Sequence, residues 1–205
     1  MRPAQFLLLL KFVIACCLLT LAHSGFAALD LQAPMPVDPA LKVGHLKNGL
    51  TYYIKENEHP KQKIELRLVV KFGSLDESDE QLGAAHFIEH LAFKHTLHFK
   101  NDSLRSKLEA IGLKYGRDLN AFTEYDLTRY EISLPNNKKE SLQMGLQALA
   151  DFAGGVEFRS SDIAGEEAII LEEQRLRDNL DTRILRATHA LALQGTKYPA
   201  RSPIG

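Results

Sequence analysis

The chain has 205 residues, of which 45% are hydrophobic and 25% charged, and its formal net charge at pH 7 is −1. This length and composition indicate one globular domain, or one domain behind a leader, and the near-zero charge gives no sign of a nucleic-acid or anionic-membrane partner. Both cysteines, Cys16 and Cys17, lie in the N-terminal apolar stretch. The remainder therefore has no disulfide and no thiolate ligand, so a metal there would need His, Asp or Glu.

The N-terminus is typical of a secretory signal peptide. Arg2 supplies the positive charge, residues 6–22 are almost all apolar, and the small residues of 24–28 follow. This order predicts a signal peptide over residues 1–27 with cleavage after Ala27, and hence secretion.

Two alternatives to cleavage stay open. A retained membrane anchor is disfavoured because Lys11 interrupts a run that is barely long enough to span a bilayer. Lipoprotein processing at Cys16 is suggested by the lipobox-like residues 13–16, and a retained, acylated Cys16 would make the chain a lipid-anchored structural protein. The apolar residues after Cys16 argue against this alternative.

The first part of the mature chain predicts an extended lead-in followed by strands. The lead-in covers residues 28–42 and is rich in proline. Asn48-Gly49 between two short apolar runs predicts a β-hairpin of strands 43–46 and 50–55. Residues 64–72 alternate apolar and polar before becoming continuously apolar, which predicts a strand that enters a core. The acidic residues of 73–81 predict a solvated loop whose charge favours the start of the next helix.

The second part mixes helices with a strand pair. The patterns predict these elements in order: a helix over 83–93, a helix capped by Asn101 or Asp102 and ending near Ile111, strands over 118–123 and 127–134, a helix over 138–153, and one long helix from Ser160 or Ser161 to about Leu193. Adjacent hairpins with interspersed helices predict an α+β fold, in which helices pack on a largely antiparallel sheet.

Segment 83–93 contains candidate metal ligands and a candidate general base. His86 and His90 are four residues apart and therefore share one face of a helix, and Glu89 leans towards the same side. Two neutral imidazoles suit Zn²⁺, and a nearby carboxylate can take a proton from metal-bound water. The H-x-x-E-H order is the inverzincin signature. The alternative is a buried apolar helix whose histidines bond to carbonyl groups.

A third ligand is sought among the acids of the late helix. Glu166, Ile170 and Glu173 share a face, and carboxylates on a buried stripe need a cation or strong hydrogen bonds. Glu167 and Glu172 lie off this stripe. The alternative is a solvated helix surface with salt bridges four residues apart, such as Glu173 with Arg177.

Together these blocks resemble the pitrilysin/insulinase family of zinc metallopeptidases. The resemblance covers about residues 43–205, and it rests on the blocks 46–52, 73–77, 83–93, 120–123 and the two acids Glu166 and Glu173. The stretch 114–121 is most similar to bacterial periplasmic members, which implies a periplasmic location.

The resemblance implies a role for each matching residue. His86, His90 and Glu173 would hold one Zn²⁺, Glu89 would be the general base, and Glu166 would orient a ligand histidine. The other implied positions concern the peptide: Asn120 and Ala121 match a strand that pairs with the substrate backbone, and Phe93 matches a pocket residue, with plain core packing as its alternative.

The implied function is zinc-dependent endopeptidase activity on peptides, with a metal-activated water and a glutamate base. Residues 43–205 would be the N-terminal catalytic domain, and a second homologous domain or chain is expected to close the chamber. The chain ends in a loop at Ser202–Gly205, so we expect a truncated domain, whose activity on its own is left open. The alternative is a non-catalytic or partner-dependent peptide-binding or assembly subunit of the same fold.

Overall fold

The computed structural model describes residues 36–100 and 103–205. The described residues belong to two compact units, which meet in the sequence between Glu56 and Asn57. The predicted signal peptide, most of the lead-in and the caps proposed at Asn101 and Asp102 lie outside the described residues.

The first unit contains the predicted hairpin. Strands β1 (Leu41–His45) and β2 (Thr51–Lys55) pair antiparallel with Val43 opposite Tyr53. Gly49 has a φ of 90°, which the turn requires and glycine adopts without steric cost. The hairpin is confirmed, although β1 begins at Leu41 and so shortens the expected lead-in.

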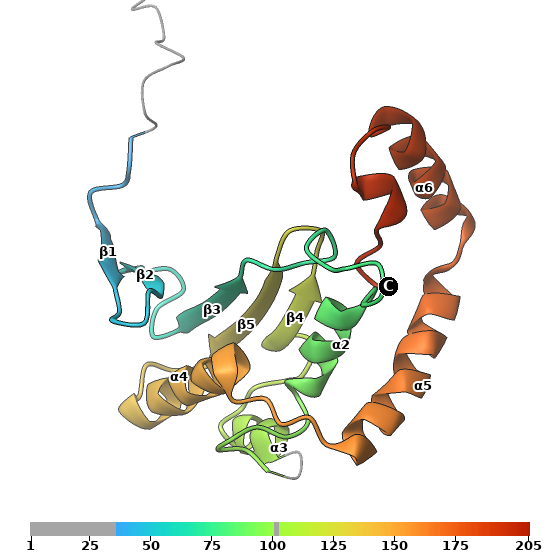
Figure 1. Cartoon of the computed structure of the whole chain (residues 1–205). Helices are drawn as coiled ribbons and strands as arrows, with labels where there is room; N and C mark the ends of the chain where they lie inside the picture. The colour runs from blue at the N-terminus through green and yellow to red at the C-terminus, as the bar shows by residue number, and fades with distance from the viewer. Residues whose placement is uncertain (1–35, 101–102) are drawn as a thin grey trace, which may run out of the picture. The chain divides into compact units, whose positions relative to one another are not determined.

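The second unit is built on a three-stranded antiparallel sheet in the order β3-β5-β4 (Figure 1). Its strands are β3 (Ile64–Val70), β4 (Leu119–Thr123) and β5 (Thr128–Leu134). The central strand β5 alternates between buried and half-buried residues along its whole length, as expected where one face of a sheet is covered. Strand β4 is an edge of this sheet.

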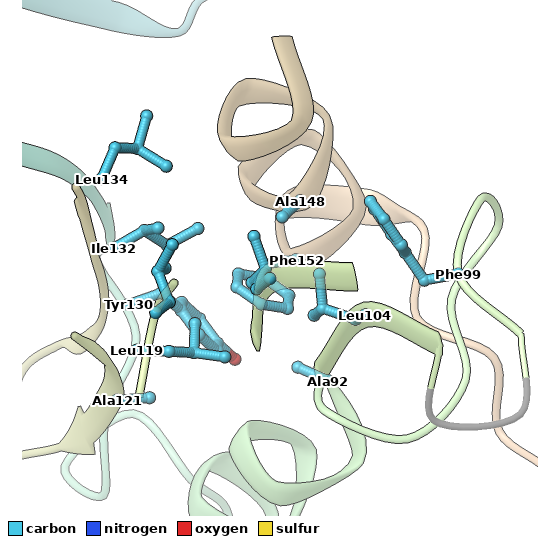
Figure 2. Packing of buried hydrophobic residues seen from close by; sticks show 12 residues of the cluster. Ala92, Phe99, Leu104, Leu119, Ala121, Tyr130, Ile132, Leu134, Ala148 and Phe152 are labelled. Atoms are coloured by element: carbon cyan, nitrogen blue, oxygen red, sulfur yellow. The ribbon is translucent and has the colours of Figure 1, made fainter. Parts of the chain in front are cut away.

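The helices of this unit, in order, are α2 (Ala84–Leu91), α3 (Ser103–Ala110), α4 (Lys139–Gly154), α5 (Ser160–Arg177), α6 (Leu180–Ala192) and the 3₁₀ turn η1 (Tyr198–Ala200). Figure 2 shows side chains of β4 and β5, such as Ile132 and Tyr130, facing Ala148 and Phe152 of α4. Helix α4 approaches the sheet so closely that a Cβ on Gly145 would lie 2.5 Å from a methyl carbon of Leu66. The predicted α+β class, with helices on an antiparallel sheet, is confirmed.

The single long helix predicted from Ser160 to about Leu193 is wrong. Helix α5 ends at Arg177, and α6 begins at Leu180 after an extended Asn179 (φ −110°, ψ 176°). The Asn179 side chain accepts a hydrogen bond from the Thr182 backbone N–H at 3.0 Å, which is an N-cap. This local cap begins a second helix, α6, where the sequence predicted one continuous helix. No helix among the described residues is long and apolar enough to cross a membrane.

Candidate metal centre

A buried glutamate outside the helix starts α2. Gly83 precedes the helix with a φ of 83°, and the Glu77 carboxylate accepts hydrogen bonds from the backbone N–H groups of Gly83 and Ala85, both at 2.9 Å. Glu77 is 3% exposed, so the expectation of a fully solvated acidic loop is wrong at this residue. Its charge does satisfy the start of the helix, as expected, because free N–H groups there favour an anion.

Two histidines of α2 and a glutamate of α5 converge on one point. The ring centroids of His86 and His90 are 4.7 Å apart. The Glu173 Oε2 atom lies 3.6 Å from His86 Nε2 and 3.4 Å from His90 Nε2. One ligand atom from each residue can be chosen so that all three lie within 4.8 Å of one another. Helix periodicity juxtaposes the histidines, whereas the packing of α5 on α2 supplies the carboxylate.

The alternative expected for Glu173, a salt bridge four residues along the helix, is present as well. The Arg177 guanidinium pairs with Glu173 Oε1, while Oε2 faces the two imidazoles. One carboxylate thus serves both contacts. Of the off-stripe acids, Glu167 is exposed and Glu172 pairs with Arg175 at 2.6 Å.

Burial keeps the first histidine neutral. His86 is 4% exposed, and its pKa is lowered from 6.5 to about 4, mainly by loss of hydration and next by the neighbouring His90, while Glu173 opposes the shift. The backbone of Ile204 also opposes the shift. A neutral imidazole is the form that binds a metal.

The second histidine is oriented by a buried carboxylate. His90 Nδ1 donates to Glu166 Oε2 at 2.9 Å, which leaves Nε2 facing Glu173. Glu166 is 3% exposed, and its other oxygen pairs with the Lys94 ammonium at 2.6 Å. The sequence indicated Glu166 in this orienting position but not Lys94, whose place three residues after α2 carries no periodic signal.

The third member of the H-x-x-E-H group lies beside the converging atoms with a partner of its own. Glu89 is 8% exposed, and its Oε2 accepts a hydrogen bond from Thr123 Oγ1 at 2.6 Å. Burial raises the pKa of Glu89, and the hydrogen bond from Thr123 opposes part of that rise. Sequence reasoning missed Thr123, although it closes the block 120–123 that the resemblance used.

The residues expected to contact a peptide lie nearby on β4 and after α2. Asn120 and Ala121 are in the edge strand β4, where the Ala121 N–H donates to the Asn120 side-chain oxygen at 3.0 Å. Phe93 is half-buried, with its ring 5.3 Å from Phe152 and 5.7 Å from Tyr115. The core packing expected as the alternative for Phe93 is therefore present.

The H-x-x-E-H order on α2 is the signature of the inverzincin class of peptidases. The family model for insulinase, peptidase family M16, matches residues 52–202. The chain therefore belongs to the insulinase family of peptidases.

Relatives named as zinc proteases match nearly the whole chain. "Probable zinc protease PqqL" of Haemophilus influenzae is 34% identical over 206 residues, covering 100% of this chain and 21% of that protein. The Escherichia coli protein of the same name is 36% identical over 175 residues, covering 85% and 19%. This chain thus spans about a fifth of the length of these relatives.

A solved structure shares the fold. The crystal structure of "the first half of the periplasmic protease PqqL" from Escherichia coli has a TM-score of 0.81 and 36% identity, over 84% of this chain and 37% of that one. Both of these relatives are named as probable zinc proteases, and the solved structure is named as part of a periplasmic protease.

Proposed function

We propose that the chain is the metal-binding part of a zinc-dependent endopeptidase, in which His86, His90 and Glu173 hold one Zn²⁺ and Glu89 is the general base. The observation that carries the proposal is the convergence of three ligand atoms from two helices within 4.8 Å, beside the buried carboxylate of Glu89. Two imidazoles and one carboxylate oxygen form a donor set that catalytic zinc sites use, with a position left for water.

Zinc bound there would polarise the scissile carbonyl and lower the pKa of a water molecule. Side chains of this chain would move the proton and orient the reacting groups. Glu89 accepts the proton of the attacking water at its carboxylate and passes it to the leaving amine. Thr123 holds Glu89 Oε2 at 2.6 Å, which leaves Oε1 for the proton. Glu166 holds His90 by Nδ1, which leaves Nε2 for the metal.

The peptide would lie along β4. An edge strand presents unpaired backbone groups, so a peptide can add to it as a further strand. Asn120 and Ala121 stand at this edge, and the Asn120 side chain, which bonds to the Ala121 N–H here, would have to give way to a substrate carbonyl.

The remaining proposals follow the relatives. Because the solved relative is named as the first half of a periplasmic protease, we propose export to the periplasm by the signal peptide of residues 1–27. A second homologous domain or chain would complete the chamber around the peptide, since this chain spans 21% and 19% of the two named relatives.

The test separates metal binding from turnover. Glu89→Gln keeps the size and polarity of the side chain but removes the base, so we expect about one zinc per chain and no detectable peptide hydrolysis. In the full-length protein that carries the second domain, the wild type should bind zinc and hydrolyse an unstructured peptide, and Glu167→Gln, an exposed acid of α5, should match it in both. Zinc binding without hydrolysis in the wild type would favour the peptide-binding alternative, and hydrolysis that survives Glu89→Gln would remove Glu89 as the base.

A further inference from the structure

Helix α5 supplies the proposed third ligand, yet it buries little apolar surface. Of its 18 residues the only buried one is Glu166, a charged residue. Ile170, on the same stripe as Glu166 and Glu173, is half-buried, whereas Ile169 is 49% exposed, Leu171 58% and Leu176 65%. Burial of apolar surface, the usual force that attaches a helix to a domain, therefore contributes little to the position of α5 among the described residues.

A series of acid–base contacts joins α5 to α2 and the turn after it. The two helices run side by side in opposite directions (Figure 1). Near the start of α5, His95 Nδ1 donates to Asp162 Oδ2 at 2.6 Å. In the middle, Glu166 pairs with His90 and Lys94, and near the end Glu173 faces the imidazoles. We call these three contacts the polar ladder.

We infer that His95 and Asp162 form a positioning pair for the candidate metal centre. Neither residue is among its proposed ligands. The inference rests on the proposed metal site, but not on peptide hydrolysis.

The spacing of the contacts along α5 explains why the His95–Asp162 contact affects the position of Glu173. Asp162 lies four residues before Glu166, and Glu173 lies seven residues after it. With a rise of about 1.5 Å per residue these arms are roughly 6 Å and 10 Å. If α5 pivots about Glu166, each ångström of movement at Asp162 therefore becomes about 1.7 Å at Glu173. Metal–ligand distances tolerate only about ±0.2 Å. The His95–Asp162 contact must therefore stay fixed if Glu173 is to remain within reach of the metal.

The contact between His95 and Asp162 is shielded from water and short. The side chains of His95 and Asp162 are 13% and 11% exposed, so water screens their contact little. A hydrogen bond of 2.6 Å between an imidazole and a carboxylate is short, as charge-assisted bonds are. An exposed ion pair, in contrast, would contribute little to position or stability.

The experiment measures zinc affinity of the full chain by competition with a chelator. We expect Asp162→Ala and His95→Ala each to weaken zinc binding about tenfold, at the lower end of what partners of metal ligands contribute. The double variant should bind zinc no more weakly than either single variant, because the two residues act as one contact. Wild-type affinity in Asp162→Ala, or additive losses in the double variant, would overturn the inference.

The matched control is Glu167→Ala, which removes the same charge from an exposed position on the same helix. Along α5, Glu167 is about 9 Å from Glu173, whereas Asp162 is about 16 Å away. If simple attraction of the dication were responsible, Glu167→Ala would weaken binding more than Asp162→Ala does, and that ranking would refute the positioning role. We expect Glu167→Ala to bind zinc like the wild type.

Hydrogen exchange distinguishes loss of position from loss of fold. In Asp162→Ala, amides of the first turns of α5 should exchange faster while those of β5 remain protected. If Asp162→Ala unfolds globally, the isosteric Asp162→Asn decides by the same affinity criterion. A full-length wild type that binds zinc without hydrolysing peptides would contradict the proposed function alone. A wild type that binds no zinc would contradict both the metal centre and this inference.

Discussion

Replacement of Glu173 tests the proposed ligand set most directly, because α5 offers an adjacent acid as a control. Glu173 Oε2 lies 3.4 and 3.6 Å from the two imidazole Nε2 atoms, whereas the Glu172 side chain is 52% exposed and pairs with Arg175. Both variants, Glu173→Ala and Glu172→Ala, remove one negative charge and shorten one side chain. Only the first removes an atom that faces the histidines.

The expected magnitude follows from the number of ligands. Structural zinc sites with four ligands are worth roughly 10–16 kcal/mol in apparent binding free energy, so one ligand contributes about 3–4 kcal/mol. Glu173→Ala should therefore weaken zinc binding by about 10²- to 10³-fold. The loss also leaves the Arg177 guanidinium, which pairs with Glu173 Oε1, without this partner near the bound cation. Glu172→Ala should change the affinity by less than about threefold, as expected for an exposed charge.

The assay is competition with a fluorescent zinc chelator at fixed pH and ionic strength, with zinc per chain as a check of stoichiometry. Equal effects of the two replacements would refute the assignment of the third ligand. The reverse ranking would mean that a different face of α5 approaches the histidines.

Three further predictions concern the base, pH and export. Thr123→Val should lower kcat for peptide hydrolysis about tenfold, with KM and zinc content unchanged. Thr123→Ser keeps the hydroxyl donor to Glu89 and should therefore keep kcat near that of the wild type. Equal kcat values in the two variants would show that this hydrogen bond does not assist the base. The pKa of His86 is lowered from 6.5 to about 4 in the folded chain, so between pH 6.5 and pH 4 the unfolded chain binds more protons than the folded one. The metal-free chain should therefore lose up to about 3 kcal/mol of folding free energy as the pH falls through this range. Urea unfolding at pH 7 and pH 5 measures this, and an unchanged pH dependence in His86→Gln would assign it to other groups. The mature N-terminus of exported protein should be Ala28 by intact mass, and retention of Met1 in exported material would contradict the signal peptide.

Where the sequence prediction failed, a hydrogen bond between near neighbours in the chain decided the structure. One helix was predicted from Ser160 to about Leu193, but Asn179 caps a new helix and separates α5 from α6. The acidic loop suggested solvation, yet Glu77 is buried because two backbone N–H groups at the start of α2 bind its carboxylate. In both places one polar side chain satisfied backbone groups that a count of apolar residues does not register.

By itself the sequence determined what depends on neighbours along the chain. The spacing of His86 and His90 places both on one face because a helix turns every 3.6 residues, and Asn48-Gly49 defines the hairpin because its turn needs a positive φ. Only the tertiary structure decided which distant groups meet them. Glu173 is 83 residues beyond His90, and Thr123 is 34 residues beyond Glu89. Such contacts depend on how α5 and β4 pack against α2, and no local periodicity encodes that packing.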